Sequence, residues 1–458
     1  MIRLYTATLG CKINQYETRS IAEAWTGHGQ AVESVAPEGA DVILVNSCAV
    51  TANAVADLRQ TVRRLHRANP AAGIIVTGCA AQVMADELAG LPGVVSVVPQ
   101  ADKGALLAGP VASPAAPLAA AIPSIDPDTT DPDTADEPGG YAPFSISGYS
   151  RARAVVKVQD GCSHHCTYCI VPLTRGPSVS RPSDEVIAEA ARLLDAGFRE
   201  LVISGINLRH YGRGLAERMD FWDLLARLDR ELAPGWAGRA RLRVSSVEPG
   251  QLDDKAFDTL AGSSMVCPHL HLSLQSSDAG VLRAMGRGHY DPRGAADFLA
   301  RLARVWPIMG LGADIITGFP GEDEAAFAET LALCRELPLT YAHVFPYSER
   351  PGTRAADMPG QVAVPVRKAR AARLRALVSR RRRAFRERLT GLPRLDVLVQ
   401  DAQGNGVCEF YAGCRLTRLP DGVGRRALVR ARPVGVERGV VMAEPLPESL
   451  PETGGDRS

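Results

Sequence analysis

The chain of 458 residues is long enough for two to four domains, and 46% hydrophobic residues can give each its own core. The formal net charge of +1 excludes a global positive field, so any attraction to nucleic acid must come from local charge. Ten cysteines at irregular spacing do not form the framework of a small disulfide-rich secreted protein. The N-terminus lacks a signal-peptide layout, and prolines interrupt the longest apolar stretch, residues 105–125. We predict a protein of the reducing cytoplasm that does not enter a membrane.

Strand and helix patterns alternate over the first hundred residues. Short apolar runs predict three strands, at residues 3–9, 41–45 and 73–77. Helical patterns lie between them, at residues 16–25 and 54–68. The alternation predicts a parallel sheet in an N-terminal α/β domain that covers residues 1–108.

A cysteine follows each of these three predicted strands, namely Cys11, Cys48 and Cys79. The carboxyl ends of parallel strands lie along one edge of a sheet, so we expect the three cysteines to be neighbours in space. One such cysteine alone is more often a buried apolar thiol. Three at equivalent strand ends predict a site for a metal cluster.

Residues 109–147 are rich in proline, alanine, aspartate and threonine, a composition that cannot bury a core. We predict an extended acidic linker there. The polar residues 447–458 predict a disordered tail.

A strand–helix pattern then repeats six times, which predicts a partial (β/α)6 barrel, open on one side, over residues 148–389. The predicted strands are residues 154–159, 201–204, 242–247, 270–274, 313–317 and 342–345. The clearest helical stretches are residues 183–196, 221–232 and 323–336.

Cys162, Cys166 and Cys169 follow the first strand of this barrel in a Cys-x-x-x-Cys-x-x-Cys arrangement. Three thiolates at this spacing can hold three irons of a 4Fe-4S cluster and leave the fourth iron open to a small molecule. The alternative is a zinc site that takes His164 or His165 as its fourth ligand. Structural zinc modules usually pair two Cys-x-x-Cys units, so the spacing favours the iron–sulfur cluster.

Polar and glycine residues end the other barrel strands, where ligands of such barrels bind. They are Gly205, Asn207, Ser246, Glu248, Gln275, Gly318, Gly321 and Glu322. Any one of them alone is more often part of an ordinary turn. Their coincidence with the cysteine loop predicts one ligand-binding face.

The last barrel segment and the C-terminus have features of RNA-binding proteins. Residues 367–388 form a helical pattern with eleven basic residues and one acid, Glu387. An apolar stripe predicts that one face packs on the barrel, and the basic face is either solvated or in contact with RNA phosphates. Short strands at residues 396–399, 406–410, 427–431 and 439–442 predict a small antiparallel β-barrel over residues 390–446.

The two cysteine triads and their order resemble the radical S-adenosylmethionine methylthiotransferase family. The resemblance implies an enzyme with two 4Fe-4S clusters: Cys162, Cys166 and Cys169 hold the one at which S-adenosylmethionine is cleaved to a radical. Cys11, Cys48 and Cys79 match the ligands of the auxiliary cluster that carries the sulfur, and Asn14 and Asn46 match neighbouring motif positions.

Further expectations follow from the same resemblance. The polar strand ends, including Gly205, Ser246, Gln275 and residues 318–322, line the S-adenosylmethionine pocket. The C-terminal barrel corresponds to a TRAM domain, tRNA is the partner, and a flavodoxin or ferredoxin supplies electrons.

Residues 8–17 and 343–348 most resemble the branch that acts on threonylcarbamoyladenosine at position 37 of tRNA. Other branches modify isopentenyladenosine in tRNA or an aspartate of ribosomal protein S12, and an iron–sulfur RNA-binding protein without turnover is a further alternative. The threonylcarbamoyl carboxylate needs a cation, for which Arg350 and Arg354 are candidates, since an arginine fork suits a carboxylate. For RNA phosphates the candidates are Arg380, Arg381, Arg382 and Arg383.

Overall fold

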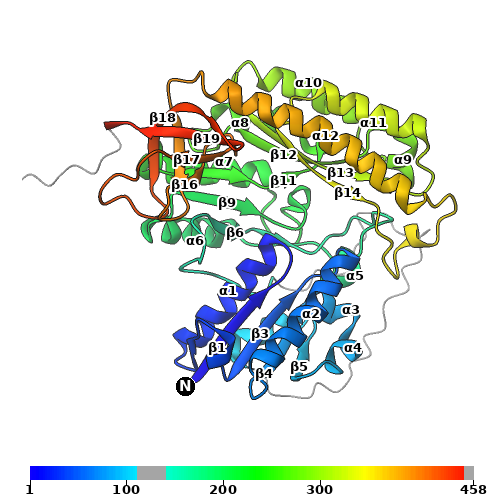
Figure 1. Cartoon of the computed structure of the whole chain (residues 1–458), viewed down its shortest axis with the longest axis vertical. Coiled ribbons are helices and arrows are strands. Elements are labelled where there is room, and N and C mark those ends of the chain that lie inside the picture. The colour runs from blue at the N-terminus through cyan, green and yellow to red at the C-terminus, as the bar shows by residue number, and fades with distance from the viewer. Residues whose placement is uncertain (111–140, 448–458) are drawn as a thin grey trace, which may run out of the picture.

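A computed structural model describes residues 1–110 and 141–447 of the chain. An N-terminal α/β domain lies below a larger α/β domain, and a small β-barrel sits at one end of the larger domain (Figure 1). None of the helices in these residues is both long enough and apolar enough to cross a bilayer.

The N-terminal domain contains the predicted parallel sheet, which has five strands instead of the three expected, in the order β2-β1-β3-β4-β5. The strands are β1 (Ile2–Thr8), β2 (Ala31–Glu33), β3 (Val42–Ser47), β4 (Gly73–Gly78) and β5 (Val94–Val98). The helices are α1 (Lys12–Gly27), α2 (Ala52–Ala68), α3 (Cys79–Val83) and α4 (Ala85–Ala89), with 3-10 turns at Pro37–Gly39 and Lys103–Ala108. The strands β2 and β5 were not predicted, and β2 has only three residues.

Local sequence explains the placement of α2. Thr51 caps its N-terminus by accepting a hydrogen bond from the backbone N–H of Ala54 at 3.2 Å. Val55, Leu58, Val62 and Leu65 are buried at helical spacing against the sheet.

The central domain confirms the predicted open barrel of parallel strands. Six successive βα units are formed by β6 (Ala154–Lys157), β9 (Glu200–Ser204), β10 and β11 (Arg241–Val244 and Ser246–Val247), β12 (His269–Gln275), β13 (Gly310–Thr317) and β14 (Tyr341–Pro346). One predicted strand, residues 242–247, is interrupted at Ser245 and therefore appears as β10 and β11. Consequently the hydrogen bonds form two sheets, β10-β9-β6 and β11-β12-β13-β14.

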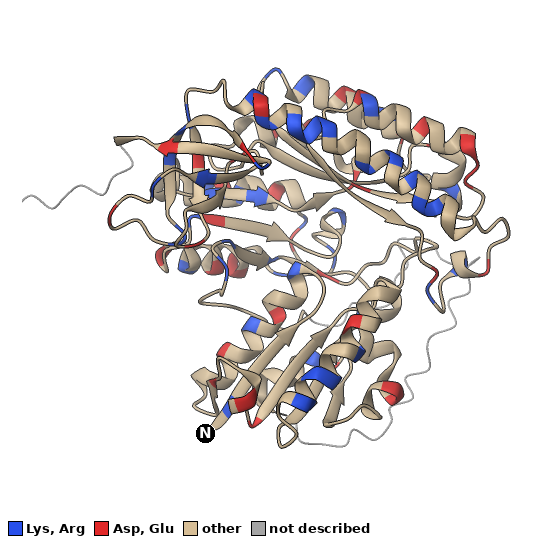
Figure 2. Cartoon of the chain, viewed as in Figure 1, with Lys and Arg blue, Asp and Glu red and all other residues tan. Residues whose placement is uncertain are grey.

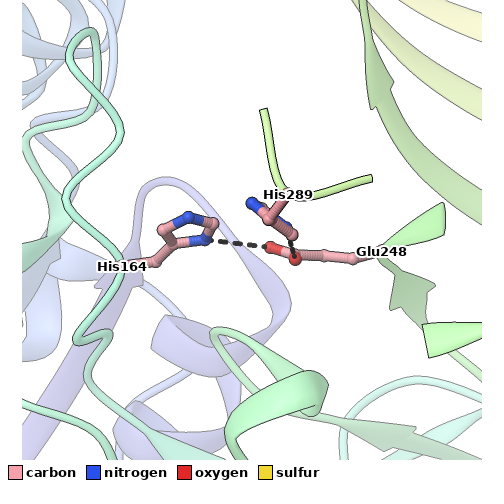
Figure 3. Close-up of side chains that lie close together, drawn as sticks. All are labelled: His164, Glu248 and His289. Carbon is pink, nitrogen blue, oxygen red and sulfur yellow. Dashed lines mark hydrogen bonds and ion pairs between the residues drawn. The ribbon is translucent and has the colours of Figure 1, made fainter. Parts of the chain in front are cut away.

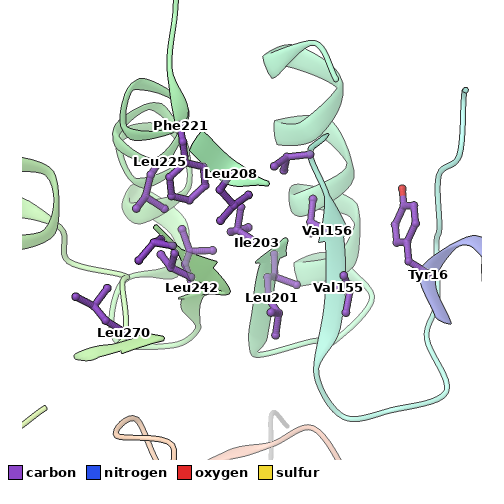
Figure 4. Packing of buried hydrophobic residues seen from close by; sticks show 14 of the residues in the cluster. Tyr16, Val155, Val156, Leu201, Ile203, Leu208, Phe221, Leu225, Leu242 and Leu270 are labelled. Atoms are coloured by element: carbon purple, nitrogen blue, oxygen red, sulfur yellow. The ribbon is translucent and has the colours of Figure 1, made fainter. Parts of the chain in front are cut away.

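Helices cover the outer face of these strands. They are α6 (Ser183–Asp195), α7 (Phe221–Trp236), α8 (Asp254–Gly262), α9 (Ala279–Ala284), α10 (Pro292–Leu302), α11 (Glu324–Glu336) and α12 (Val364–Leu389). The cysteine loop is flanked by the short strands β7 (Gln159–Asp160) and β8 (Val179–Ser180) and the helix α5 (Val171–Arg175), and short 3-10 turns lie at Leu208–His210, Pro249–Gln251 and Arg354–Ala356. Figure 4 shows Val155, Ile203 and Phe221 packed in the core between strands and helices.

The N-terminal and central domains share this core, because Tyr16 and Trp25 of α1 belong to the same buried cluster as the barrel strands. Residues 141–147, assigned to the linker from sequence, are part of the packed structure: Phe144 and Ile146 are 2% and 1% exposed. The Tyr16 hydroxyl donates to the carbonyl of Phe144 at 2.8 Å. Most of the predicted linker, residues 111–140, and residues 448–458 of the predicted tail lie outside the described residues.

The C-terminal domain is a closed five-stranded barrel with the order β15-β16-β17-β19-β18. Its strands are β15 (Leu395–Val399), β16 (Asn405–Val407), β17 (Gly413–Leu416), β18 (Leu428–Glu437) and β19 (Val440–Pro445). The prediction of an antiparallel barrel needs one correction, because β17 pairs with β19 in parallel. The strand β17, which the sequence did not suggest, is the element that makes this closure possible.

Candidate functional site

The three N-terminal cysteines lie together at one edge of the sheet. Cys11 is the N-cap of α1 after β1, Cys48 follows β3, and Cys79 begins α3 after β4. Burial raises the pKa of the Cys48 thiol, and the neighbouring Cys79 and Cys11 raise it further. All three are free thiols. The expected triad is therefore assembled by three neighbouring strand ends.

Asparagine side chains hold this edge in shape. Asn14 Nδ2 donates to the carbonyl oxygens of Leu9 at 3.0 Å and Ser47 at 2.8 Å, which ties together the loops after β1 and β3. Its Oδ1 lies 3.6 Å from the Sγ of Cys11. Gly78 has φ of 97°, and a Cβ there would stand 2.4 Å from Asn46 Oδ1, so the turn before Cys79 requires glycine.

Cys162, Cys166 and Cys169 converge in the loop after β7. The Nδ2 of Asn207 is 3.7 Å from the Sγ of Cys162, and the Nη1 of Arg287 is 3.6 Å from the Sγ of Cys166. Burial raises the pKa of Cys162 to about 11 and that of Cys169 to about 12. Three desolvated thiols that lie near one another in one loop, with cationic and amide donors beside them, fit a cluster that binds them as thiolates.

A buried carboxylate, Glu248, stands next to this loop. Its oxygens lie 3.6 Å from His164 Nδ1 and 3.2 Å from His289 Nε2 (Figure 3). Asn207 and Arg287 contact the same carboxylate at 3.2 Å and 3.3 Å. Burial opposes ionisation, but His164, His289 and Arg287 hold the pKa of Glu248 well below its usual range.

His164 and His165, the alternative candidates for a fourth zinc ligand, lie in different environments. His164 directs its Nδ1 toward Glu248 and packs its ring against His289, with centroids 4.5 Å apart. His165 is exposed. Neither arrangement adds an imidazole to the three thiols.

The other strand-end residues surround the same face, in two groups. Gly205 packs so closely that a Cβ would stand 2.9 Å from that of Gln159. Ser246 begins the two-residue strand β11, Gln275 ends β12, and both are half-buried. Glu322 instead accepts hydrogen bonds from the backbone of Gly318 at 2.9 Å and from Arg370 at 2.8 Å. Gly321 donates to the carbonyl of Gly360 at 2.9 Å, so this loop is anchored to α12 and to the turn before it.

A buried polar network joins the two cysteine sites. Arg175 of α5 donates to Glu17 Oε1 at 2.9 Å, Asp160 Oδ1 at 2.8 Å and Asn14 Oδ1 at 2.7 Å. Glu17 also pairs with Lys103 at 2.6 Å and Lys157 at 2.8 Å. Three cations therefore face two carboxylates, and Arg175 interacts with the charges of Cys79 and Cys11. The excess positive charge suits an anionic thiolate cluster.

The arginines predicted for the substrate lie in four different settings. Arg350 is buried, its Nε has no hydrogen-bond partner, and it interacts with the charge of Cys48. Arg354 is exposed on its 3-10 turn. On α12, Arg380, Arg382 and Arg383 are exposed along a stripe of basic residues (Figure 2). Arg381 donates to the carbonyls of Leu337 and Arg335 and so belongs to the packing of the helix.

The sequence reasoning did not identify Arg175, Arg287 or His289. Arg287 and His289 lie in Gly286-Arg287-Gly288-His289, a basic, glycine-rich turn after α9. Such a turn between two helices, following the ligand-facing end of β12, is a usable signal. Arg175 gives no such signal, because its partners come from distant parts of the chain.

Comparisons with known proteins first define the class. Residues 156–334 match the Radical SAM superfamily, and residues 3–99 match the Uncharacterized protein family UPF0004. The fold is similar to that of the radical S-adenosylmethionine methyltransferase TsrM from Kitasatospora setae, with a TM-score of 0.55, 16% identity and coverage of 78% of this chain and 77% of that one.

Two relatives then define the family. The threonylcarbamoyladenosine tRNA methylthiotransferase MtaB of Bacillus subtilis is 36% identical over 380 residues, which cover 81% of this chain and 79% of that protein. The MtaB of Thermotoga maritima is 32% identical over 411 residues and 88% of either chain. The chain belongs to the radical SAM methylthiotransferase family, in the MtaB group, and is an enzyme of that class. Membership implies S-adenosylmethionine and 4Fe-4S clusters as its cofactors.

Proposed function

We propose that the protein replaces the C2 hydrogen of threonylcarbamoyladenosine, at position 37 beside the tRNA anticodon, with a methylthio group. The observation that carries the proposal is the pair of cysteine sites joined through Arg175. The names of the relatives agree with this substrate. We further propose that a flavodoxin or ferredoxin supplies the electrons and that the enzyme works in the cytoplasm, where its free cysteines stay reduced.

The protein's part in this reaction is ligation and orientation. We assign one 4Fe-4S cluster to Cys162, Cys166 and Cys169 and the auxiliary one to Cys11, Cys48 and Cys79. When bound, these groups supply the electron that cleaves S-adenosylmethionine and the sulfur that is transferred. We assign the binding of S-adenosylmethionine beside the first triad to Asn207 and Glu248, together with Gly205, Ser246 and Gln275. Asn207 supports this assignment, because its Nδ2 lies 3.7 Å from the Sγ of Cys162 and 3.2 Å from Glu248. Glu248 remains anionic and can accept from a ligand ammonium group.

The test is to delete the gene in its host and to analyse the nucleosides of digested tRNA by mass spectrometry. Loss of the methylthio nucleoside, with accumulation of unmodified threonylcarbamoyladenosine, is the expected result. Intact methylthio-threonylcarbamoyladenosine, beside lost methylthio-isopentenyladenosine or an unmodified S12 aspartate, would assign the protein to another branch. Purified protein that fails to cleave S-adenosylmethionine reductively would instead support a binding role without turnover.

A further inference from the structure

A carboxylate with an imidazole on either side lies on three neighbouring strands of the central domain. The strands are β12, β13 and β14, which run side by side (Figure 1) and carry His271, Asp314 and His343. Asp314 and His343 are direct cross-strand neighbours. Asp314 Oδ1 lies 3.0 Å from His271 Nε2 and 3.1 Å from His343 Nδ1, and the three atoms all lie within 4.8 Å of one another. We call these three residues the His–Asp–His group.

The His–Asp–His group lies on the inner face of the open barrel. The chain neighbours Leu272, Ala313 and Val344 belong to the apolar core that the strands share with the covering helices. Side chains alternate along a strand, so the three polar side chains point to the opposite face. Branched apolar residues usually fill the inside of such barrels. Two histidines and an aspartate at this place therefore indicate a binding site.

Asp314 has only histidines as ionic partners. Within residues 1–110 and 141–447, its ion pairs are those with His271 and His343, and none is with a lysine or an arginine. Arg243, on the preceding strand β10, pairs with Glu200 at 2.7 Å instead. Burial opposes ionisation of Asp314, but the two histidines hold its pKa well below its usual range. The group offers one anionic oxygen and two imidazole nitrogens, which are ligands of divalent transition metals.

The spacing and the surroundings of His271 fit a metal ligand. Two ligands at right angles on one ion, with bonds of about 2.1 Å, stand about 3.0 Å apart. The outer nitrogen of His271, Nδ1, lies 2.9 Å from the hydroxyl of Tyr341, which also lies 2.9 Å from His269 Nε2. Such a partner at the outer nitrogen orients a metal-binding histidine. A Cβ at Gly312 would stand 2.2 Å from Cζ of Tyr341, so the glycine gives this tyrosine its place beside His271.

The His–Asp–His group is open to solvent on one side. The side chain of His343 is 58% exposed and that of Asp314 is 23% exposed, whereas His271 is buried. An ion can therefore enter without a rearrangement of the strands. Three protein ligands leave further coordination positions for water or for another oxygen ligand.

We propose that His271, Asp314 and His343 bind a divalent transition metal ion, with zinc as the ion that the donor set accepts most simply. Two histidines and one carboxylate are the protein ligands of zinc sites and of non-haem iron(II) sites that keep open positions. The site uses none of the six cysteines assigned to the clusters. It does not depend on which nucleoside the enzyme modifies.

The test is an anaerobic titration of iron-loaded protein with Zn²⁺, in competition with a chromophoric chelator. Loading with iron occupies the cysteines, so that they do not take up the zinc. We expect Asp314→Asn and His343→Gln each to bind one equivalent of zinc less than the wild type. Tyr341→Phe should keep this equivalent with an affinity lowered by about 10- to 100-fold, the effect of losing a partner of a metal ligand. Because His343 is exposed, its replacement tests the site without disturbing the core.

Two controls and a spectrum separate this site from others. His28→Gln removes an exposed histidine at the end of α1 and should keep full zinc binding. X-ray absorption at the zinc edge should show nitrogen and oxygen ligands at about 2.0–2.2 Å. A sulfur ligand at about 2.3 Å would place the zinc on cysteines and overturn the inference. Equal zinc binding by the wild type and Asp314→Asn would also overturn it, as would loss of the equivalent in Glu248→Gln but not in Asp314→Asn.

Discussion

Glu17 is a fully buried carboxylate shared by Lys103, Lys157 and Arg175. Burial opposes its charge, but the three cations hold its pKa well below the usual range. We expect Glu17→Gln to lower the free energy of unfolding by about 3–5 kcal/mol, the cost of breaking a buried ion pair from one side. Urea unfolding followed by fluorescence measures this change.

The matched control for Glu17 is Glu87→Gln, which breaks the exposed pair between α4 and Arg59 of α2. Solvent screens that pair, so no measurable change in stability is expected. The direction of the pKa shift also determines how the contribution of Glu17 to stability depends on pH. Because the pKa of Glu17 is lower in the folded state, this contribution is complete above the unfolded pKa of about 4.5 and is lost as the pH falls below it. Equal losses in both variants would contradict the role of burial.

The pKa of Glu409, which lies at the contact between the C-terminal barrel and β10, is shifted in the opposite direction. Burial and, less strongly, Asp396 raise its pKa to about 7, while the Arg241 charge acts against this. A raised folded pKa means that stability is highest below the unfolded pKa of about 4.5 and declines as the pH rises toward 7. We expect Glu409→Gln to remove this decline, measured as the difference in Tm between pH 5.5 and pH 8. An unchanged pH profile would show that Glu409 titrates normally.

At the scale of elements, α12 has two faces of different character. Its buried residues Ala371, Leu374 and Leu377 pack on the barrel, while Arg380, Arg382 and Arg383 face outward. We expect the triple change of these three arginines to Ala to weaken tRNA binding. The slope of log K against log salt should decrease by about 0.7–0.9 for each lost phosphate contact.

Two other arginines serve as controls for α12. Arg381→Ala should reduce stability but keep the salt slope, because Arg381 bonds to the carbonyls of Leu337 and Arg335. Arg230→Ala on the exposed face of α7 should change neither quantity. A triple variant with the wild-type salt slope would assign the basic face to solvation alone.

The sequence predicted those helices and strands whose hydrophobic periodicity is visible within the element itself. The apolar stripe of α12 and the strand ends that hold Cys11, Cys48 and Cys79 follow from periodicity and from the βα alternation. Short strands such as β2 and β17 were missed because three or four residues give too little periodicity. The interruption at Ser245 was also missed, since it lies where the strand changes partner, from β9 at Val244 to β12 at Ser246, and pairing is not encoded in the strand's own sequence.

For the whole molecule, the residues that the sequence could not place are those that join domains. Arg175 contacts Glu17 and Asn14, which are about 160 positions away in the chain, at 2.9 Å and 2.7 Å. Such contacts depend on domain packing, which no local pattern encodes.

The same packing predicts two clusters that can be removed separately. The triads Cys11/Cys48/Cys79 and Cys162/Cys166/Cys169 belong to different domains, and the network around Arg175 lies between them. Anaerobically reconstituted protein should hold about eight irons, and changing either triad to Ala should remove roughly half of them. Reductive cleavage of S-adenosylmethionine should survive only when the second triad is intact. Full iron content in either triple variant would overturn the ligand assignment, and loss of all iron in one of them would show that the two sites do not assemble independently.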